Sequence, residues 1–172
     1  RQDFSNDRTC NIKIKIMFGN KFFNKKILIY GLGLSGNSCF NYLYKKNNVK
    51  VFDDNKSLQN KKNNKFFLER KEILKDKFDY IVLSPGIDIN KCTLKNYLLR
   101  NLKNIITELD IFYLSYPNNV KITITGTNGK STTCQMLYNI FNLRNLDVRL
   151  VGNIGKPPLT ETKIKKKTKL KI

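Results

Sequence analysis

"KKILIYGLGLSGNSCFNYLYKKNNVKVFDD", residues 25–54, is the stretch that decides the fold. Its first apolar run, ILIY at 27–30, has the length of a buried strand in a parallel sheet. Three glycines follow in a G-x-G-x-x-G pattern, and apolar residues at helical spacing come next. A second apolar run, VKVF at 49–52, ends in the acidic pair Asp53 and Asp54. Strand, glycine turn, helix and acidic strand end, in this order, predict a βαβ unit that binds a nucleotide.

Each glycine of the turn has a physical role in that prediction. Gly31 permits a tight turn from strand to helix, Gly33 lets a pyrophosphate approach the backbone, and Gly36 allows close packing of helix against strand. The open amides at the helix start, with the positive end of the helix dipole, attract phosphates, and Ser35 adds a hydroxyl. A turn used only for packing does not explain why an acidic residue falls about 20 positions later.

The rest of the first half continues the alternation of strands and helices. "FDYIVLSPGIDIN", residues 78–90, predicts a buried strand at 80–83 that breaks at the turn 84–86. A helix is expected in "CTLKNYLLRNL" at 92–102, and a strand in "NIIT" at 104–107. This alternation predicts a doubly wound parallel sheet, whose ligand crevice lies at the carboxyl ends of the strands.

A second nucleotide loop follows in "PNNVKITITGTNGKSTTCQMLYNIF", residues 117–141. Residues 120–125 are expected to form a strand, the loop follows, and a helix with one apolar side comes next. A further strand is expected in "DVRLV" at 147–151. Backbone amides of the loop can ring a triphosphate, Lys130 can neutralise the β and γ phosphates, and Ser131 or Thr132 can hold Mg²⁺. The residues expected to bind ATP are Gly126, Thr127, Asn128, Gly129, Lys130, Ser131 and Thr132.

Composition excludes several other classes of protein. The chain has 172 residues and a formal charge of +20, but its basic residues are spread along the whole sequence without an aromatic-interleaved motif, so no nucleic-acid partner is expected. It has no histidine, which removes Ser-His and Cys-His catalysis, and its four cysteines are widely spaced, which favours buried thiols over a zinc site. No apolar run has the length of a bilayer span and no secretory signal stands at the start, so a cytoplasmic protein is expected.

The loop "TGTNGKST" resembles the ATP-binding loop of the Mur ligases and their folate-linked relatives, which use it in place of the longer Walker pattern. Four further motifs, taken in order, look most like the D-glutamate-adding members of that family, over about residues 25–159. They are "GLGLSG" at 31–36, "VFDD" at 51–54, "SPGI" at 84–87 and "GNIG" at 152–155. The resemblance implies an α/β chain, with a Rossmann-like parallel-sheet amino-terminal domain followed by the truncated start of a P-loop-type Mur ligase central domain.

The expected domain organisation has four parts. Residues 1–16 are interpreted as an upstream extension, and 17–112 as the Rossmann-like domain that binds a UDP substrate. Residues 113–119 are expected to be a linker, and 120–172 an incomplete ATP-binding domain that ends in a cut.

The resemblance also implies an activity, cofactors and site residues. The parent enzyme would be an ADP-forming, Mg²⁺-dependent ligase of peptidoglycan precursor synthesis, monomeric, that adds D-glutamate to UDP-N-acetylmuramoyl-L-alanine through an acyl phosphate. Its later metal-binding and amino-acid-binding motifs are absent from this chain, so the 172 residues alone are expected to be inactive. Lys130 would be catalytic, Ser131 would lie near the metal and Asn153 would reach the muramoyl substrate. The residues implied to border the UDP moiety are Gly33, Leu34, Ser35, Gly36, Asp53, Asp54, Ser84, Pro85 and Gly86.

Three other functions compete with this hypothesis. An NAD-dependent oxidoreductase would explain the glycine turn and Asp53, but not "GTNGKST". A basic binding module would explain the charge alone. A folate-adding or another muramyl-adding ligase would share the ATP loop, although "SPGI" and the position of the glycine turn favour the D-glutamate branch.

Overall fold

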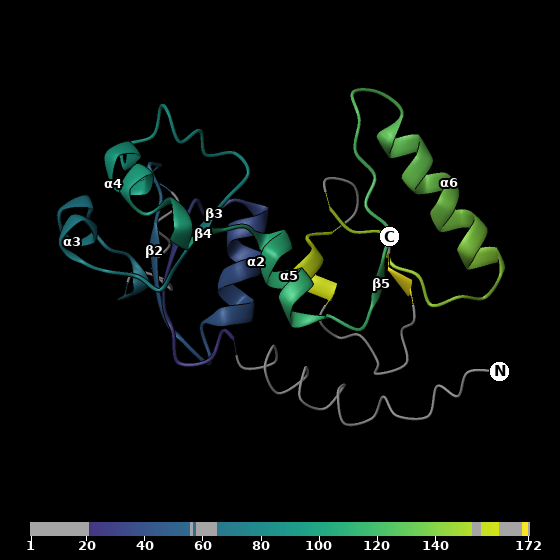
Figure 1. Cartoon of the computed structure of the whole chain (residues 1–172), viewed down its shortest axis with the longest axis horizontal. Coiled ribbons are helices and arrows are strands. Elements are labelled where there is room, and N and C mark those ends of the chain that lie inside the picture. The colour runs from purple at the N-terminus through teal and green to yellow at the C-terminus, as the bar shows by residue number, and fades with distance from the viewer. Residues whose placement is uncertain (1–20, 56, 58–64, 153–155, 162–169, 172) are drawn as a thin grey trace, which may run out of the picture. The chain divides into compact units, whose positions relative to one another are not determined.

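A computed structural model of the chain describes residues 21–55, 57, 65–152, 156–161 and 170–171 (Figure 1). The chain divides into two compact units after Pro117, and each unit is described by itself. Within the described residues, no helix combines the length and the apolar character that crossing a membrane requires. The extension expected at 1–16 lies outside the described residues.

The first unit is built on a four-stranded sheet in which every neighbouring pair is parallel. The strand order is β2-β1-β3-β4, so the chain moves from β1 to one side and then returns to the other. The predicted parallel sheet is therefore confirmed. Its strands are β1 (Lys26–Tyr30), β2 (Asn48–Phe52), β3 (Tyr80–Leu83) and β4 (Ile105–Ile106).

Helices cover both faces of this sheet, with α2 and α5 on one face and α3 and α4 on the other (Figure 1). Because successive side chains of a strand point to opposite faces, Leu28 and Tyr30 of β1 pack in a cluster with residues of α3 and α4. Ile27 and Ile29 are equally buried, with no exposed surface. The helices are α2 (Leu34–Leu43), α3 (Arg70–Lys75), α4 (Lys95–Arg100) and α5 (Glu108–Ser115), with a 3₁₀ turn at Leu102–Asn104.

Local hydrogen bonds set where α4 and α5 begin. The helix predicted at 92–102 begins only at Lys95, because the preceding residues form turns in which the Cys92 amide donates to the Asp88 carbonyl. The segment predicted as a linker, 113–119, starts inside α5. Thr107 begins that helix, since its hydroxyl accepts from the Asp110 amide while the Asp110 carboxylate accepts from the Thr107 amide.

The second unit contains less regular structure than the sequence predicts. The strand predicted at 120–125 is limited to two residues, because the partner it pairs with among the described residues, β6, is equally short. The prediction of a strand at 147–151 is wrong. Val151 forms a single bridge to Lys156, and residues 147–150 pair with no strand in the described part of the chain. The elements are β5 (Val120–Lys121), α6 (Lys130–Leu143), the 3₁₀ helix Pro158–Glu161 and β6 (Leu170–Lys171).

Candidate functional site

The carboxyl ends of β1 and β3 lie side by side in the centre of the first sheet, where the strand order reverses. Open parallel sheets bind ligands at this kind of switch point. Gly31 follows β1 and Ser84 follows β3, and the two are joined directly because the Ser84 hydroxyl donates to the Gly31 carbonyl over 2.8 Å. The glycine turn and the "SPGI" turn, 53 residues apart in sequence, are therefore bonded neighbours at this edge of the sheet.

Close packing explains two of the three glycines of the turn. A Cβ atom on Gly36 would lie 1.8 Å from the Gly31 carbonyl oxygen, a distance at which the helix and the turn could not coexist. Gly31 itself has a φ of +93°, and a Cβ there would lie 2.8 Å from the Ser84 Cβ. Gly33 differs from both, because nothing lies within 4 Å of the place where its Cβ would be. That open space lies beside the start of α2.

The first turn of α2 presents amides that no side chain caps. Gly33 is the N-cap residue and makes no side-chain cap bond, so the amides that follow it keep the free donors of a helix start. The carbonyls of the turn are satisfied instead, since the Asn37 side-chain amide donates to Leu32 over 2.6 Å and to Gly33 over 3.2 Å. Ser35 is half-buried on this turn and Leu34 is exposed. Free donors and the positive end of a ten-residue helix together favour an anion here.

The two aspartates that end β2 have separate roles. The Asp53 carboxylate accepts from the Leu32 amide over 2.6 Å and from the Asn55 amide over 2.8 Å, which fastens the glycine turn to the end of the neighbouring strand. Asp54 accepts from two hydroxyls, that of Tyr30 at 2.6 Å and that of Thr93 at 2.5 Å. Both carboxylates therefore lie at the predicted edge of the sheet and bind protein donors there.

The "SPGI" turn is also where the sequence places it, at the end of β3. Ser84 is buried, and its hydroxyl is directed to Gly31 and not to solvent. Pro85 and Gly86 are exposed beside it, and the Ile87 amide closes the turn by donating to the Ser84 carbonyl. Of the three predicted residues, Ser84 thus holds the turn against Gly31, while Pro85 and Gly86 are exposed.

Sequence reasoning did not identify Tyr30, Asn37 or Thr93 as part of this site. Tyr30 is the residue with a detectable signal, because a hydroxyl ends an otherwise aliphatic strand directly before the first glycine. A buried tyrosine normally has a partner for its hydroxyl. Burial, and then the hydrogen bond and charge of Asp54, raise the pKa of Tyr30 far above its ordinary value, so the phenol stays protonated as a donor.

The second predicted site is the loop before α6 in the second unit. Gly129 is its N-cap residue with φ +73°, and Gly126 has φ +147°, so both use backbone conformations that favour glycine. Lys130 begins the helix and donates to the carbonyls of Gly126 and, over 2.9 Å, of Thr127. Ser131 and Thr132 are exposed on the first turn of α6. The loop and its lysine thus form one local structure at the start of a fourteen-residue helix.

The loop of residues 126–132 fits a nucleoside triphosphate with Mg²⁺. The helix start has no side-chain cap, the glycines leave the backbone accessible, and Ser131 offers a hydroxyl oxygen of the kind that Mg²⁺ accepts. Within the described residues, no group of three or more cysteine, aspartate or glutamate side chains gathers as a metal site. Asn153, predicted to reach the muramoyl substrate, lies outside the described residues.

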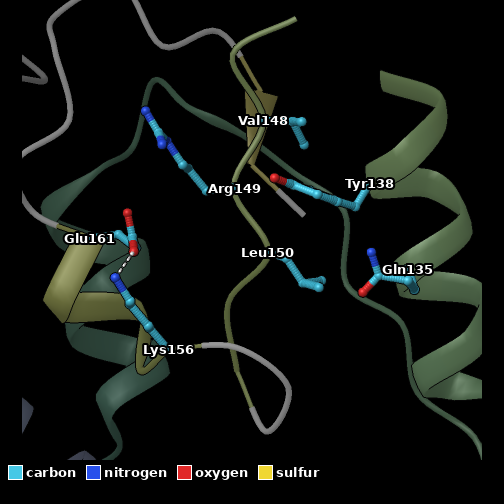
Figure 2. A pocket seen from close by; sticks show the side chains of 7 residues that line it. All are labelled: Gln135, Tyr138, Val148, Arg149, Leu150, Lys156 and Glu161. Carbon is cyan, nitrogen blue, oxygen red and sulfur yellow. Dashed lines mark ion pairs between the residues drawn. The ribbon is translucent and has the colours of Figure 1, made fainter. Parts of the chain in front are cut away.

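A separate cavity of about 320 Å³ lies in the second unit (Figure 2). On one side Gln135 and Tyr138 project from α6, and on the other Lys156 pairs with Glu161 at 3.9 Å. The remaining lining residues are Val148, Arg149 and Leu150. The cavity begins one helical turn beyond Ser131, and the predicted ATP-binding residues do not line it.

Comparison with known proteins agrees with the geometry of the first unit. Residues 25–106 match the family model of the Mur ligase MurD-like N-terminal domain. Among curated proteins the chain is similar to UDP-N-acetylmuramoylalanine–D-glutamate ligases of three bacteria. The ligase of Rickettsia prowazekii is 35% identical over 81% of this chain, that of Buchnera aphidicola 38% over 80%, and that of Streptococcus mutans 33% over 83%.

The chain spans about a third of the length of these relatives, 32% for the first two and 35% for the third. The matched family region includes β1, the glycine turn, both aspartates and the "SPGI" turn, which lie at the carboxyl ends of the parallel strands. Over residues 25–106, the chain is therefore similar to the MurD-like N-terminal domain of the Mur ligases.

Proposed function

We propose that the crevice at the carboxyl ends of β1 and β3 binds the UDP end of UDP-N-acetylmuramoyl-L-alanine. The observation that carries this proposal is the uncapped first turn of α2 beside the open space at Gly33, within a MurD-like domain. Amides of Leu34, Ser35 and Gly36 would donate to the diphosphate, because a helix start offers free N–H groups to an anion. Pro85 and Gly86 would form the opposite wall.

The uracil and ribose would then lie toward the end of β2. Asp53 and Asp54 stand at that end, beside the glycine turn. Carboxylate oxygens have several acceptor positions each, so an aspartate that already accepts from a backbone amide can accept from a further donor of the ligand. Both aspartates would in this way contribute to the recognition of the nucleoside.

The loop of residues 126–132 would bind ATP in the whole protein. Its backbone amides would surround the phosphates, Lys130 would compensate their charge, and Ser131 would contribute an oxygen to Mg²⁺. ATP would supply the phosphoryl group that turns the substrate carboxylate into an activated acyl group, and D-glutamate would provide the amine. Lys130 would leave the carbonyls of Gly126 and Thr127 for the phosphates, a change that a flexible side chain makes readily.

The activity that follows is the ADP-forming addition of D-glutamate during peptidoglycan precursor synthesis, in the cytoplasm, by a monomer. The relatives are named as D-glutamate ligases, which supports D-glutamate over other amino acids. Because the chain spans about a third of those relatives, we assign this activity to the whole protein and not to the 172 residues alone. D-glutamate-dependent ADP release by the 172-residue chain would contradict that assignment.

The alternative, an NAD-dependent oxidoreductase, rests on the same glycine turn. Isothermal titration of the chain with UDP, UDP-N-acetylmuramoyl-L-alanine and NAD separates the two. We expect the UDP compounds to bind and NAD not to bind, and saturable binding of NAD alone would overturn the proposal.

For the loop of residues 126–132, the titrant is ATP with Mg²⁺. Lys130→Met is expected to weaken ATP binding. The control is Lys103→Met, at an exposed site in the first unit, which is expected to leave ATP binding unchanged.

A further inference from the structure

Tyr30 has a hydroxyl that the packing of its ring does not require. The residue ends β1 with no exposed surface, and its ring lies in the cluster formed with α3 and α4. A phenylalanine would fill the same volume. The hydroxyl instead reaches out of the cluster to the Asp54 carboxylate, at 2.6 Å, across 24 residues of sequence. The tyrosine therefore carries a polar contact at the end of the strand, where the glycine turn begins.

Asp54 also binds a residue of the segment that precedes α4. Its other carboxylate oxygen accepts from the Thr93 hydroxyl at 2.5 Å, and Thr93 lies 39 residues further along the chain. Thr93 stands immediately before Leu94, the buried N-cap residue of α4. One carboxylate thus connects the end of β1 with the last residue of the loop 84–93.

The first residue of that loop is bound to the same strand end. The Ser84 amide donates to the Tyr30 carbonyl over 3.0 Å, and the Ser84 hydroxyl donates to the Gly31 carbonyl. Between its two ends the loop is held by turns, with the Asn90 amide donating to the Asp88 carboxylate. The loop is therefore fastened at both ends to the last residues of β1, directly at Ser84 and through Asp54 at Thr93.

We propose that Tyr30, Asp54 and Thr93 are positioning residues of the UDP site, which hold the loop 84–93 at a fixed place beside the glycine turn. This inference rests on the proposed function in one respect, that the crevice binds UDP. The loop carries Pro85 and Gly86, one wall of the crevice, and the first turn of α2 is the other wall. A fixed separation of the walls means that binding does not have to order the loop, which saves conformational entropy.

The two hydroxyl donors also fix the orientation of the Asp54 carboxylate, since each of its oxygens accepts one hydrogen bond. Burial and the hydrogen bond to Asp54 raise the pKa of Tyr30, so this donor persists at every pH at which the protein is handled.

The test uses the 172-residue chain and two measurements, hydrogen–deuterium exchange of the amides of residues 88–93 and the affinity for UDP. Tyr30→Phe and Thr93→Val each remove one hydroxyl without removing the bulk of the side chain. Each is expected to speed the exchange of these amides and to weaken UDP binding by up to roughly tenfold, because binding then has to order the loop. Thr93→Ser keeps the hydroxyl and is expected to restore both values to those of the unsubstituted chain.

The double variant Tyr30→Phe with Thr93→Val adds a stricter criterion. Both hydroxyls act through Asp54, so the combined loss of UDP affinity is expected to differ from the product of the single losses. The positioning role is overturned if the single variants leave exchange and affinity unchanged. It is also overturned if exchange rises equally in β1 and β3, or if Thr93→Ser behaves as Thr93→Val. If the unsubstituted chain does not bind UDP but exchange responds as expected, the UDP function fails and the role in holding the loop stands.

Discussion

The backbone amide of Leu32 donates to the carboxylate of Asp53 over 2.6 Å, and this bond joins the glycine turn to the end of the neighbouring strand. Leu32 is only 5% exposed, so its amide has little access to water when the acceptor is removed. We expect Asp53→Ala to lower the free energy of unfolding by about 1–3 kcal/mol, the cost of a buried donor without a partner. Urea denaturation measures this difference.

Asp53→Asn is the matched control, because the side-chain amide keeps one oxygen that can accept from Leu32. Its loss of stability is expected to be smaller than that of the alanine variant. Equal unfolding midpoints for Asp53→Ala and the unsubstituted chain would show that the bond does not stabilise the turn.

Gly36→Ala is expected to lower the stability of the fold, whereas Gly33→Ala is expected to weaken UDP binding. A Cβ at Gly36 would meet the Gly31 carbonyl oxygen at 1.8 Å, and a backbone atom cannot move away as a flexible side chain can. We expect this variant to lose at least about 3 kcal/mol of stability or to fail to fold. Gly33→Ala places its methyl group in open space, so its melting temperature should stay close to that of the unsubstituted chain while UDP binding weakens. Circular dichroism melts and UDP titration of both variants distinguish a packing role from a binding role, and a Gly36→Ala variant of normal stability would refute the first.

The sequence predicted the centre of the first sheet well because β1 and β3 are buried on both faces. The run at 27–30 and the run at 80–83 are continuous in apolar residues, and the structure places β1 and β3 there with a difference of one residue at most. Gly31 and Gly36 were also recognised, because a position that has no room for a side chain appears in the sequence as a glycine. The order of the motifs also predicted that the glycine turn, Asp53 and Ser84 lie at neighbouring strand ends, where hydrogen bonds join them.

The connections across the site were not predictable from local patterns. The partners of Asp54 are 24 and 39 residues away, and only the fold brings them together. The strand prediction for the second unit failed for a different reason. The residues 122–125 alternate as a strand does, but a strand forms only beside a partner, and among the described residues β5 finds one of two residues.

Cys39 is expected to resist thiol reagents in the folded chain. It has no exposed surface in α2, and burial, followed by the negative charge of Glu108, raises the pKa of its thiol well above the ordinary value. Cys92 and Cys134 are free thiols with partial exposure, so they should be alkylated first. Iodoacetamide labelling at pH 8 with peptide mapping checks this order, and rapid modification of Cys39 without denaturant would show that α2 opens readily. In urea Cys39 should react as readily as Cys92 and Cys134.

Acid is expected to remove part of the stability of the first unit through Asp76. The Lys26 ammonium, 2.5 Å from the Asp76 carboxylate, holds the pKa of that carboxyl below its ordinary value of 3.8. A depressed pKa in the folded state contributes stability that is present above the unfolded pKa and is lost as the pH falls through the folded one. Because the pair is about a third exposed, Asp76→Asn should lower the free energy of unfolding at pH 7 by no more than about 1 kcal/mol, and the difference should vanish near pH 2.

Urea denaturation at pH 7, 4 and 2 measures this trend. The control is Asp88→Asn, which should change stability little because the lysine partner of Asp88 is 3.9 Å away on the surface. A difference for Asp76→Asn that is independent of pH would place its cause outside the ion pair.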